Sequence, residues 1–578
     1  MASAITSHAK SRNLTCPLSV MSFVILIIII TCLTNLAESN PNPLPSRFSK
    51  FSRGATTVPT MDYSICNGIP YRSACESVVM SMKEERNSRM TPEDLYDHSI
   101  RVSLNQVDSA LAQLSSNLSQ SYHKIVTPMA VGGTTDCIEL LEDSSYLLSN
   151  VINTKNEPED VQTWLSAALT NQETCLESLA NDKTQVEKHM PMFAMALNLT
   201  QIISNTLALY MSNSKSGHKL KQHTGGSGGR KLLNARGSIF PSWVNDRERK
   251  LLEASAGEIS IIAHAVVAKD GRGTHKSIGD AIRLITASMS AGGRSVIYVK
   301  AGTYHENIKI TTKQKNVMLV GDGKGKSIIV GDKNAEAGSS TFQSATVGAM
   351  GDGFIARDIT FVNSAGPDKN QAVALRVGSD KSVIFRCSIL GYQDTLYTLS
   401  KRQFYRDTDI YGTVDFIFGN SAVVFQNCNI YARKPLSGQK NYVTAQGRSD
   451  ENQNTGISIH NCRIVAASDL AGSNSRITYL GRPWKQYSRT VIMQSFLDNS
   501  INPSGWSPWS GSFALSTLYY GEYMNSGPGA STSGRVHWAG YRGTLSADEA
   551  QEFTVGSFIG GNLWLPSTGV SFDSGLIG

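Results

Sequence analysis

Five short segments in the second half of the chain resemble one another. They cover residues 355–361, 384–389, 404–410, 424–430 and 459–464, and each combines β-branched or aromatic residues with a polar interruption. A polar marker recurs at Arg357, Arg386, Arg406, Gln426 and His460, with gaps of 29, 20, 20 and 34 residues. Imperfect repeats of this size, without helical patterns between them, predict a β-solenoid whose coils stack on one another. A β-sandwich is the alternative fold for this part of the chain.

The N-terminus has the pattern of a targeting segment. Lys10 and Arg12 precede an apolar run from Val20 to Leu33, and residues 1–40 therefore combine a positive region with a hydrophobic one. This segment is either a cleaved signal peptide or a persistent signal anchor. Both alternatives place the rest of the 578-residue chain in the secretory lumen, and a chain of this length is expected to fold as more than one domain.

Residues 60–215 have the periodicity of helices. Thr91 precedes Pro92 and two acidic residues, which is typical of a helix N-terminus. Residues 137–151, 161–179 and 191–211 then place apolar side chains at spacings of three and four. This region is predicted to be an all-α, four-helix bundle.

The cysteines fit an oxidising compartment. Four of the nine lie in the helical region, and an even set of this kind predicts two disulfides: Cys66, Cys75, Cys137 and Cys175. Glycosylation sequons at Asn117 and Asn198 agree with secretion. No cysteine or histidine pair has zinc spacing, so the sequence predicts no metal site.

A linker over residues 216–252 separates the helical region from the solenoid region, residues 253–578. It contains the glycine-rich stretch 225–229, and the word Arg-Lys-Leu-Leu occurs at 230–233 and again at 249–252. A repeated dibasic word in a flexible linker is best explained as a processing site for a subtilisin-like protease. A solvated basic linker is the alternative.

The charge balance of the solenoid region favours an anionic partner. The whole chain carries a formal charge of +7; from Glu253 onward, 31 Lys and Arg oppose 25 Asp and Glu, a balance of +6. Nucleic acid, an anionic membrane and an acidic polymer all meet this criterion. An elongated solenoid face suits an extended polymer.

Two aspartates stand out in this region. Asp415 lies within the apolar run Val414–Phe418, where an ionised side chain is costly unless it is paired. Arg482, in a Gly-Arg-Pro turn, is a plausible partner. Asp394 lies in the word Gly-Tyr-Gln-Asp-Thr-Leu-Tyr. Taken alone, each acid could be a turn or capping residue.

Several long words, taken in order, resemble those of plant pectinesterases (pectin methylesterases). They are residues 302–306, 371–376, 391–397, 412–420, 480–484 and 520–523. The helical region resembles, less specifically, the pectinesterase-inhibitor domain that precedes the enzyme in many precursors of this family. The resemblance implies a right-handed parallel β-helix and an enzyme that hydrolyses the methyl esters of pectin without a cofactor.

The resemblance also implies roles for individual residues. Asp415 would be the nucleophile and Asp394 the general acid, and later the base. Gln371 and Gln393 would stabilise the oxyanion, and Arg482 would hold Asp415 ionised and oriented. The remaining positions that would contact the sugar chain are Thr341, Phe342, Tyr397, Phe418, Trp484 and Trp509. For Phe342 and Phe418, packing inside the solenoid is the alternative.

Two cysteine positions follow from the same resemblance. Cys428 and Cys462 match a family disulfide. Many relatives carry cysteine where this chain has Thr408, so Cys387 is expected to lack a partner.

The implied substrate is methylated homogalacturonan, whose demethylated form is a polyanion. Other implied partners are the processing protease and pectinesterase-inhibitor proteins, and no nucleic acid is expected. The implied location is the plant cell wall, reached through the secretory pathway. If the N-terminal segment is a signal anchor, the precursor would be anchored in the Golgi membrane.

Three alternatives remain at this point. Another pectin-acting β-helix enzyme would cut the chain, but the Gly-His-Gly word of the hydrolases and the calcium-binding acids of the lyases are not found. A non-catalytic wall-binding scaffold would not need the intact set of amides and acids. For the helical region, a folding or sorting segment is the alternative to an intramolecular inhibitor.

Overall fold

The computed structural model describes residues 63–82, 91–121, 132–153, 158–181, 186–217, 263–289, 292–472 and 476–578. Residues 1–40 and both Arg-Lys-Leu-Leu words lie outside these ranges. The described residues belong to one compact unit, Tyr63–Gly578, so the contacts between its helices and strands are internal to that unit.

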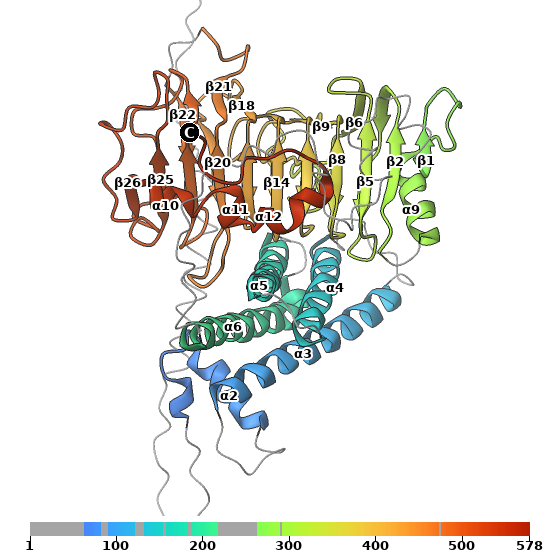
Figure 1. The fold of residues 1–578 in the computed structure, drawn as a ribbon. Coiled ribbons are helices and arrows are strands. Elements are labelled where there is room, and N and C mark those ends of the chain that lie inside the picture. The colour runs from blue at the N-terminus through green and yellow to red at the C-terminus, as the bar shows by residue number, and fades with distance from the viewer. Residues whose placement is uncertain are drawn as a thin grey trace, which may run out of the picture. The chain divides into compact units, whose positions relative to one another are not determined.

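The N-terminal part is the predicted helical bundle (Figure 1). Its elements are the short helix η1 (Ser64–Cys66), α2 (Arg72–Met82), α3 (Pro92–Ser121), α4 (Gly132–Asn153), α5 (Pro158–Asn181) and α6 (Val186–Gly217). The helix α3 begins where Thr91 and Asp94 exchange hydrogen bonds between side chain and backbone, which satisfies free amides of the first turn. Long helices α3 to α6 pack on one another around a leucine-rich core. The predicted four-helix bundle is confirmed.

One segment of α6, Met190–Ser214, is long and apolar enough to cross a membrane by length and composition alone. More than half of it is buried inside the structure, and Leu199, Ile203 and Leu207 are fully covered. This segment therefore behaves as the core helix of the bundle.

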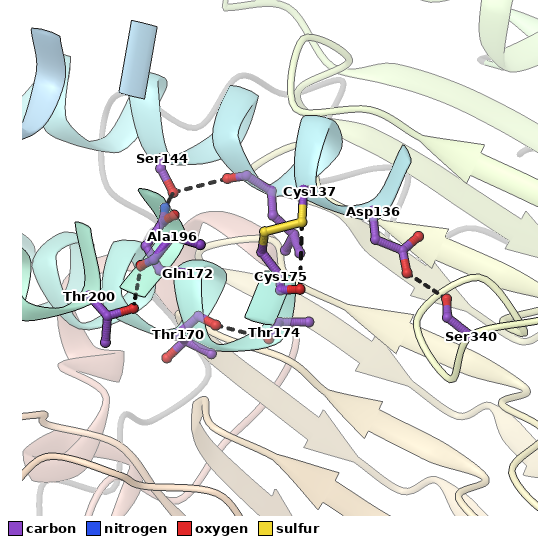
Figure 2. The surroundings of a disulfide bond; sticks show 11 residues. Asp136, Cys137, Ser144, Thr170, Gln172, Thr174, Cys175, Ala196, Thr200 and Ser340 are labelled. Atoms are coloured by element: carbon purple, nitrogen blue, oxygen red, sulfur yellow. Dashed lines mark hydrogen bonds between the residues drawn. A yellow bond between two sulfur atoms is a disulfide. The ribbon is translucent and has the colours of Figure 1, made fainter. Parts of the chain in front are cut away.

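Two disulfides cross-link the bundle. Cys66 joins Cys75, and Cys137 on α4 joins Cys175 on α5. Figure 2 shows the second bond between its two helices, with Ser144 and Gln172 nearby. The four cysteines predicted to form disulfides therefore do so.

Removing the Cys137–Cys175 bond is expected to destabilise the bundle. The bond closes a loop with a sequence separation of 38, for which the chain-entropy argument gives about 4 kcal/mol. We expect Cys137→Ser/Cys175→Ser to lower the bundle's midpoint in urea while the β-strand signal keeps its own midpoint. A single unchanged transition for both parts would contradict this expectation.

The C-terminal part is a parallel β-helix of three sheets (Figure 1). The 11-stranded sheet contains β1 (Ala265–Val267), β2 (Ser295–Val299), β5 (Val317–Gly321), β8 (Ile355–Arg357), β11 (Ser382–Phe385), β14 (Arg402–Arg406), β17 (Ala422–Gln426), β20 (Gly456–His460), β23 (Arg489–Met493), β25 (Tyr519–Tyr523) and β26 (Tyr541–Thr544). The 8-stranded sheet contains β3 (Gly302–His305), β6 (Ser327–Gly331), β9 (Thr360–Asn363), β12 (Ser388–Leu390), β15 (Asp409–Gly412), β18 (Asn429–Ala432), β21 (Arg463–Ala466) and β24 (Phe496–Leu497). The 7-stranded sheet contains β4 (Ile308–Ile310), β7 (Val347–Ala349), β10 (Leu375–Val377), β13 (Leu396–Thr398), β16 (Ile417–Gly419), β19 (Asn441–Gln446) and β22 (Thr478–Gly481). The predicted right-handed β-helix is confirmed, and the β-sandwich is wrong.

The sequence repeats mark one corner of this β-helix. Four of the markers are in register across successive strands of the 11-stranded sheet, whereas Phe385, not Arg386, occupies the equivalent place in the second coil. The next residue of each coil has a positive φ, as at Asp358 (59°) and Asn427 (56°). A left-handed residue lets the chain turn sharply into the 8-stranded sheet, which explains why polar residues interrupt the apolar pattern there.

Short helices flank the β-helix. The helix α9 (Ile278–Ser288) lies at its N-terminal end and packs on β2. The C-terminal elements α10 (Ala547–Gln551), α11 (Val555–Phe558), α12 (Gly561–Trp564) and η3 (Leu565–Thr568) follow the last strand. They cover the outer face of the 11-stranded sheet (Figure 1), where Val555 and Trp564 share a cluster with Phe404. The contacts on the outer face of the 7-stranded sheet are described below.

The predicted Cys428–Cys462 disulfide is wrong. Both residues occur in the structure as buried free thiols, and so does Cys387. Each points into the coil and lies within hydrogen-bonding distance of backbone carbonyls, Cys428 Sγ at 3.5 Å from Gln426 O and Cys462 Sγ at 3.3 Å from His460 O. Stacked thiols that each find a carbonyl acceptor need no bond between them. Thr408 fills the place opposite Cys387 and accepts a hydrogen bond from its backbone amide at 3.3 Å.

Candidate active site

The two candidate catalytic acids occupy the same place on adjacent coils. Asp394 and Asp415 lie two residues before Leu396 and Ile417, which are partners in the register of β13 and β16. Neighbouring strands in such a sheet are about 4.8 Å apart, so the two carboxyl groups face one small volume. Both residues have positive φ, 61° and 51°, and both are buried, with 8% and 6% exposure. The fold therefore places two acids in a strained, largely dry turn.

Arg482 holds Asp415 through two parallel hydrogen bonds. Its Nε donates to Oδ1 at 2.7 Å, and its Nη2 donates to Oδ2 at 2.6 Å. The guanidinium itself is placed between two aromatic rings, 4.1 Å from the centroid of Tyr442 and 4.3 Å from that of Trp509. A bidentate pair of this kind fixes the orientation of the carboxylate as well as its charge. This partnership was predicted from the apolar neighbours of Asp415.

The two acids differ in proton affinity. Burial raises the pKa of Asp415, and the hydrogen bonds from Arg482 oppose that rise. Burial also raises the pKa of Asp394, and the adjacent Asp415 raises it further, to well above its ordinary value. Pairing with Arg482 alone would lower the pKa of Asp415 below the ordinary carboxyl range. With the site buried as it is here, burial outweighs this effect and the pKa is not lowered. Arg482 does leave Asp415 as the acid that ionises more readily, with Asp394 as the proton carrier.

Two amides lie beside these acids. Gln371 and Gln393 are half-buried on successive coils, where the Ala372 backbone amide donates to the Gln393 carbonyl oxygen at 3.3 Å. Among the residues that the structure describes, no side-chain hydrogen bond uses either amide group. Within the described part of the protein, their N–H donors are therefore not used by other side chains.

Aromatic side chains extend from the acids along the outer face of the 7-stranded sheet. Tyr397 and Phe418 stack with centroids 4.3 Å apart, and Trp484 meets Phe418 edge-on at 5.9 Å. Gly447 allows this approach, because a Cβ atom there would lie 2.8 Å from the Trp484 ring. These rings form a continuous apolar surface, in which Trp484 stands edge-on to Phe418.

The other predicted contact residues lie at the edges of this surface. Phe342 is buried, with the Arg376 guanidinium carbon 3.3 Å from its ring centroid. Thr341 is half-buried beside it, and its carbonyl accepts a hydrogen bond from the Ser344 hydroxyl at 2.8 Å. Trp509 contacts Arg482, so it helps to fix the guanidinium that binds Asp415.

The helical bundle covers this face. One hydrophobic cluster contains bundle leucines together with Phe342, Tyr397 and Phe418. Polar contacts surround it: Ser340 donates to Asp136 at 2.5 Å, as Figure 2 shows, and Asn420 donates to Thr170 at 2.8 Å. The aromatic surface of the 7-stranded sheet is therefore covered by the bundle.

Ion pairs complete the contact between the bundle and the β-helix. Lys401 pairs with Asp143 at 2.8 Å, and both side chains are fully buried. Arg402 pairs with Asp160 at 2.6 Å, and Lys485 pairs with Glu177. The bundle supplies the acids and the β-helix supplies the bases in each pair. Part of the positive charge that the sequence shows for residues 253–578 therefore pairs with acids of this chain's own bundle.

Sequence reasoning missed several residues of the covered face. Lys309, Arg376 and Lys401 were given no role. Lys309 and Arg376 each lie between apolar strand residues, the signal that identified Asp415, whereas Lys401 lies between Ser400 and Arg402. The acids Asp136, Glu139 and Asp143 recur on one face of α4 at spacings of three and four. That spacing indicates a shared face but not what lies opposite.

Comparison with known proteins agrees with the architecture. The sequence profile described as Pectinesterase matches residues 264–562, and the profile described as Plant invertase/pectin methylesterase inhibitor matches residues 63–209. The chain belongs to the pectinesterase family. It resembles "Probable pectinesterase/pectinesterase inhibitor 16" of Arabidopsis thaliana, with 52% identity over 99% of this chain and 100% of that protein.

Other pectinesterases support the same assignment. "Probable pectinesterase/pectinesterase inhibitor 35" of Arabidopsis thaliana is 59% identical over 80% of this chain and 84% of its own. "Pectinesterase 2" of Citrus sinensis is 49% identical over 89% of this chain and 94% of its own. The solved structure "Pectin methylesterase from Carrot" is 58% identical, with a TM-score of 0.53, and covers 54% of this chain and 98% of its own. A pectinesterase can thus exist as the β-helix without the bundle.

Proposed function

We propose that this pectinesterase hydrolyses the methyl esters of homogalacturonan to give pectate and methanol in the plant cell wall. The observation that carries the proposal is the pairing of Arg482 with Asp415 beside a second buried acid, Asp394, on the adjacent coil. The half-buried amides of Gln371 and Gln393 supply donors for the oxyanion. Acids, amides and aromatic surface together meet the needs of acyl transfer on a sugar polymer.

In the acylation step, an Asp415 oxygen attacks the ester carbonyl carbon. The carbonyl oxygen gains negative charge, which the amides of Gln371 and Gln393 stabilise, an effect worth about 3 kcal/mol per donor in other acyl-transfer enzymes. The bond to the methoxy oxygen then breaks, and Asp394 gives its proton to that oxygen, so that methanol departs. An anhydride between Asp415 and the uronate remains.

In the second step, Asp394 is ionised and acts as a base. It takes a proton from water, which attacks the uronate carbonyl carbon of the anhydride. The anhydride bond breaks, Asp415 returns as a carboxylate, and Asp394 is protonated again. Arg482 stabilises the returning negative charge, and the sugar chain stays intact throughout.

Methanol release from highly methylated pectin by a fragment starting at residue 253 tests this proposal. Uronate chain length is followed in the same samples. Methanol without chain shortening is the expected result. Shortened chains would assign the site to a chain-cutting enzyme, and no methanol from a folded fragment would favour a binding scaffold.

We infer that the bundle inhibits the enzyme until the linker is cut by a subtilisin-like protease at an Arg-Lys-Leu-Leu word. The inference is supported by Asp136, Asp143 and Thr170 of the bundle, which bind residues of the β-helix that flank the 7-stranded sheet. Separate pectinesterase-inhibitor proteins would use the same face once the bundle has left. The N-terminal segment directs the precursor to the secretory pathway, as a cleaved signal or a Golgi anchor.

The affinity of the bundle for the β-helix is expected to fall as pH rises. Burial at the contact raises the pKa of Glu173 from 4.5 to about 7. A carboxyl with a raised pKa in the complex favours association in its protonated form. The Glu173 contribution is therefore complete below its ordinary pKa and is lost as pH rises through about 7, by at most about tenfold per pH unit.

The inhibition constant of the isolated bundle, measured from pH 4.5 to 8, checks this expectation. Glu173→Gln should flatten much of the dependence, because its amide does not titrate. Glu93→Gln, at an exposed acid of α3, is the matched control and should leave the profile unchanged. Tighter inhibition at higher pH would contradict the assigned sign.

A further inference from the structure

A straight row of outward-facing residues runs across the 7-stranded sheet. Strand register aligns one residue from each of six strands: Lys309, Gly348, Arg376, Tyr397, Phe418 and Ala445. Tyr397 and Phe418 belong to the strands that follow the two catalytic acids. Both cations of the row lie on one side of them, in the preceding coils. The row therefore has a cationic end and an apolar end.

The bundle places a carboxylate between the two cations. Arg376 Nη2 donates to Glu139 Oε1 at 2.9 Å, and Lys309 Nζ lies 3.7 Å from Glu139 Oε2. Burial alone would raise the pKa of Glu139, but Arg376 and Lys309 outweigh it and lower that pKa. In contrast, burial raises the pKa of the neighbouring Asp136, whose partners Ser340 and Gln343 are uncharged. Glu139 is thus an acid of α4 that the β-helix holds as an anion.

The guanidinium of Arg376 is built into the β-helix. It stacks on Phe342, its Nη1 lies 3.2 Å from Met350 Sδ, and its Nε is buried without a hydrogen-bond partner among the described residues. Gly348 leaves the space beside it open, since a Cβ atom there would lie 2.8 Å from Nη2. Within the described part of the chain, Glu139 is the one acid in a salt bridge with either Arg376 or Lys309. Departure of the bundle would leave these two cations on the outer face of the 7-stranded sheet without a counter-ion.

We propose that Arg376 and Lys309 form a subsite for the carboxylate of a demethylated uronate, and that Glu139 occupies this subsite in the precursor. The proposal rests on the proposed function, because it gives the bundle and the polymer the same binding face. It assigns carboxylate recognition to the coils that precede the catalytic acids. Free carboxylates of pectate therefore compete with Glu139 for the same two cations.

Calorimetric binding of a fully demethylated galacturonate hexamer to the fragment from residue 253 tests the subsite. Lys309→Met is expected to weaken binding about tenfold, because it removes one charge while keeping the side-chain length. Lys324→Met is the matched control, since Lys324 pairs with Asp409 of the 8-stranded sheet, and it should bind as the wild type does. Equal hexamer affinity for the Lys309→Met and wild-type fragments would overturn the proposal, as would equal losses in both lysine variants.

A second measurement distinguishes loss of the subsite from a general loss of binding affinity. Glu139→Gln in the bundle should weaken its binding to the wild-type fragment several-fold and have little effect on binding to Lys309→Met. Additive losses would overturn the shared site. Because both readouts are binding, a fragment that releases no methanol would reject the proposed esterase function while the hexamer data still decide the subsite.

Discussion

Asp415→Asn is expected to lower kcat by at least about a thousandfold, because an amide cannot form the anhydride with the uronate. The substitution keeps the size of the side chain but leaves Arg482 without its carboxylate. Methanol release from methylated pectin by the fragment from residue 253 measures the loss. A thermal unfolding midpoint for the same variant separates lost chemistry from lost folding.

Asp394→Asn provides the informative comparison. Loss of the general acid should lower kcat on the methyl ester by about a hundred- to ten-thousandfold. An ester with a better leaving group, such as a nitrophenyl ester, needs no protonation. It should therefore give a burst of leaving group with Asp394→Asn and none with Asp415→Asn. A burst from Asp415→Asn would assign the nucleophile to another residue.

Asp143→Asn is expected to produce the largest loss of affinity between the bundle and the β-helix. Lys401 and Asp143 are fully buried and 2.8 Å apart, and removing one charge of such a pair leaves the other poorly compensated. Asp352, at 3.3 Å from Lys401, retains part of the compensation. We expect a loss of about 3 kcal/mol, or about 150-fold in the inhibition constant of the isolated bundle.

Asp97→Asn is the control for this experiment, because Asp97 is an exposed acid of α3. Its inhibition constant should match that of the wild-type bundle. Asp143→Asn should also leave the bundle folded, since the new side chain keeps an oxygen for the hydrogen bond that Asn171 donates at 2.9 Å. If a folded Asp143→Asn bundle inhibits as strongly as the wild-type bundle, the ion pair between Asp143 and Lys401 does not contribute to the affinity.

The sequence predicted the β-helix because its corners repeat. Each turn from the 11-stranded into the 8-stranded sheet needs a left-handed residue, and Asp358 and Asn427 meet that need with polar side chains that interrupt apolar runs. The periodicity of the bundle was equally visible in α4, which buries one stripe, whereas α5 is buried on all sides over residues 165–172. Both features are local, so they remain visible in the order of residues.

The site was predicted in part for the same reason. Asp415 stood out as a charge among apolar neighbours, and the structure supplies its predicted partner, Arg482. The partnership of Glu139 with Arg376 joins residues 237 positions apart, and no local pattern indicates it. The prediction of a Cys428–Cys462 bond was wrong for a different reason. Equivalent places on adjacent coils bring two thiols close, but their oxidation does not follow from proximity.

The most direct test of this account is methanol release by the uncut precursor before and after protease cleavage of its linker, at pH 5. We predict little methanol from the intact chain, because the bundle packs on Tyr397 and Phe418, which lie on the strands that follow Asp394 and Asp415. Activity should rise after cleavage and fall again when excess bundle is added back. Equal activity of the intact and cut chains would contradict the claim that the bundle closes the active site.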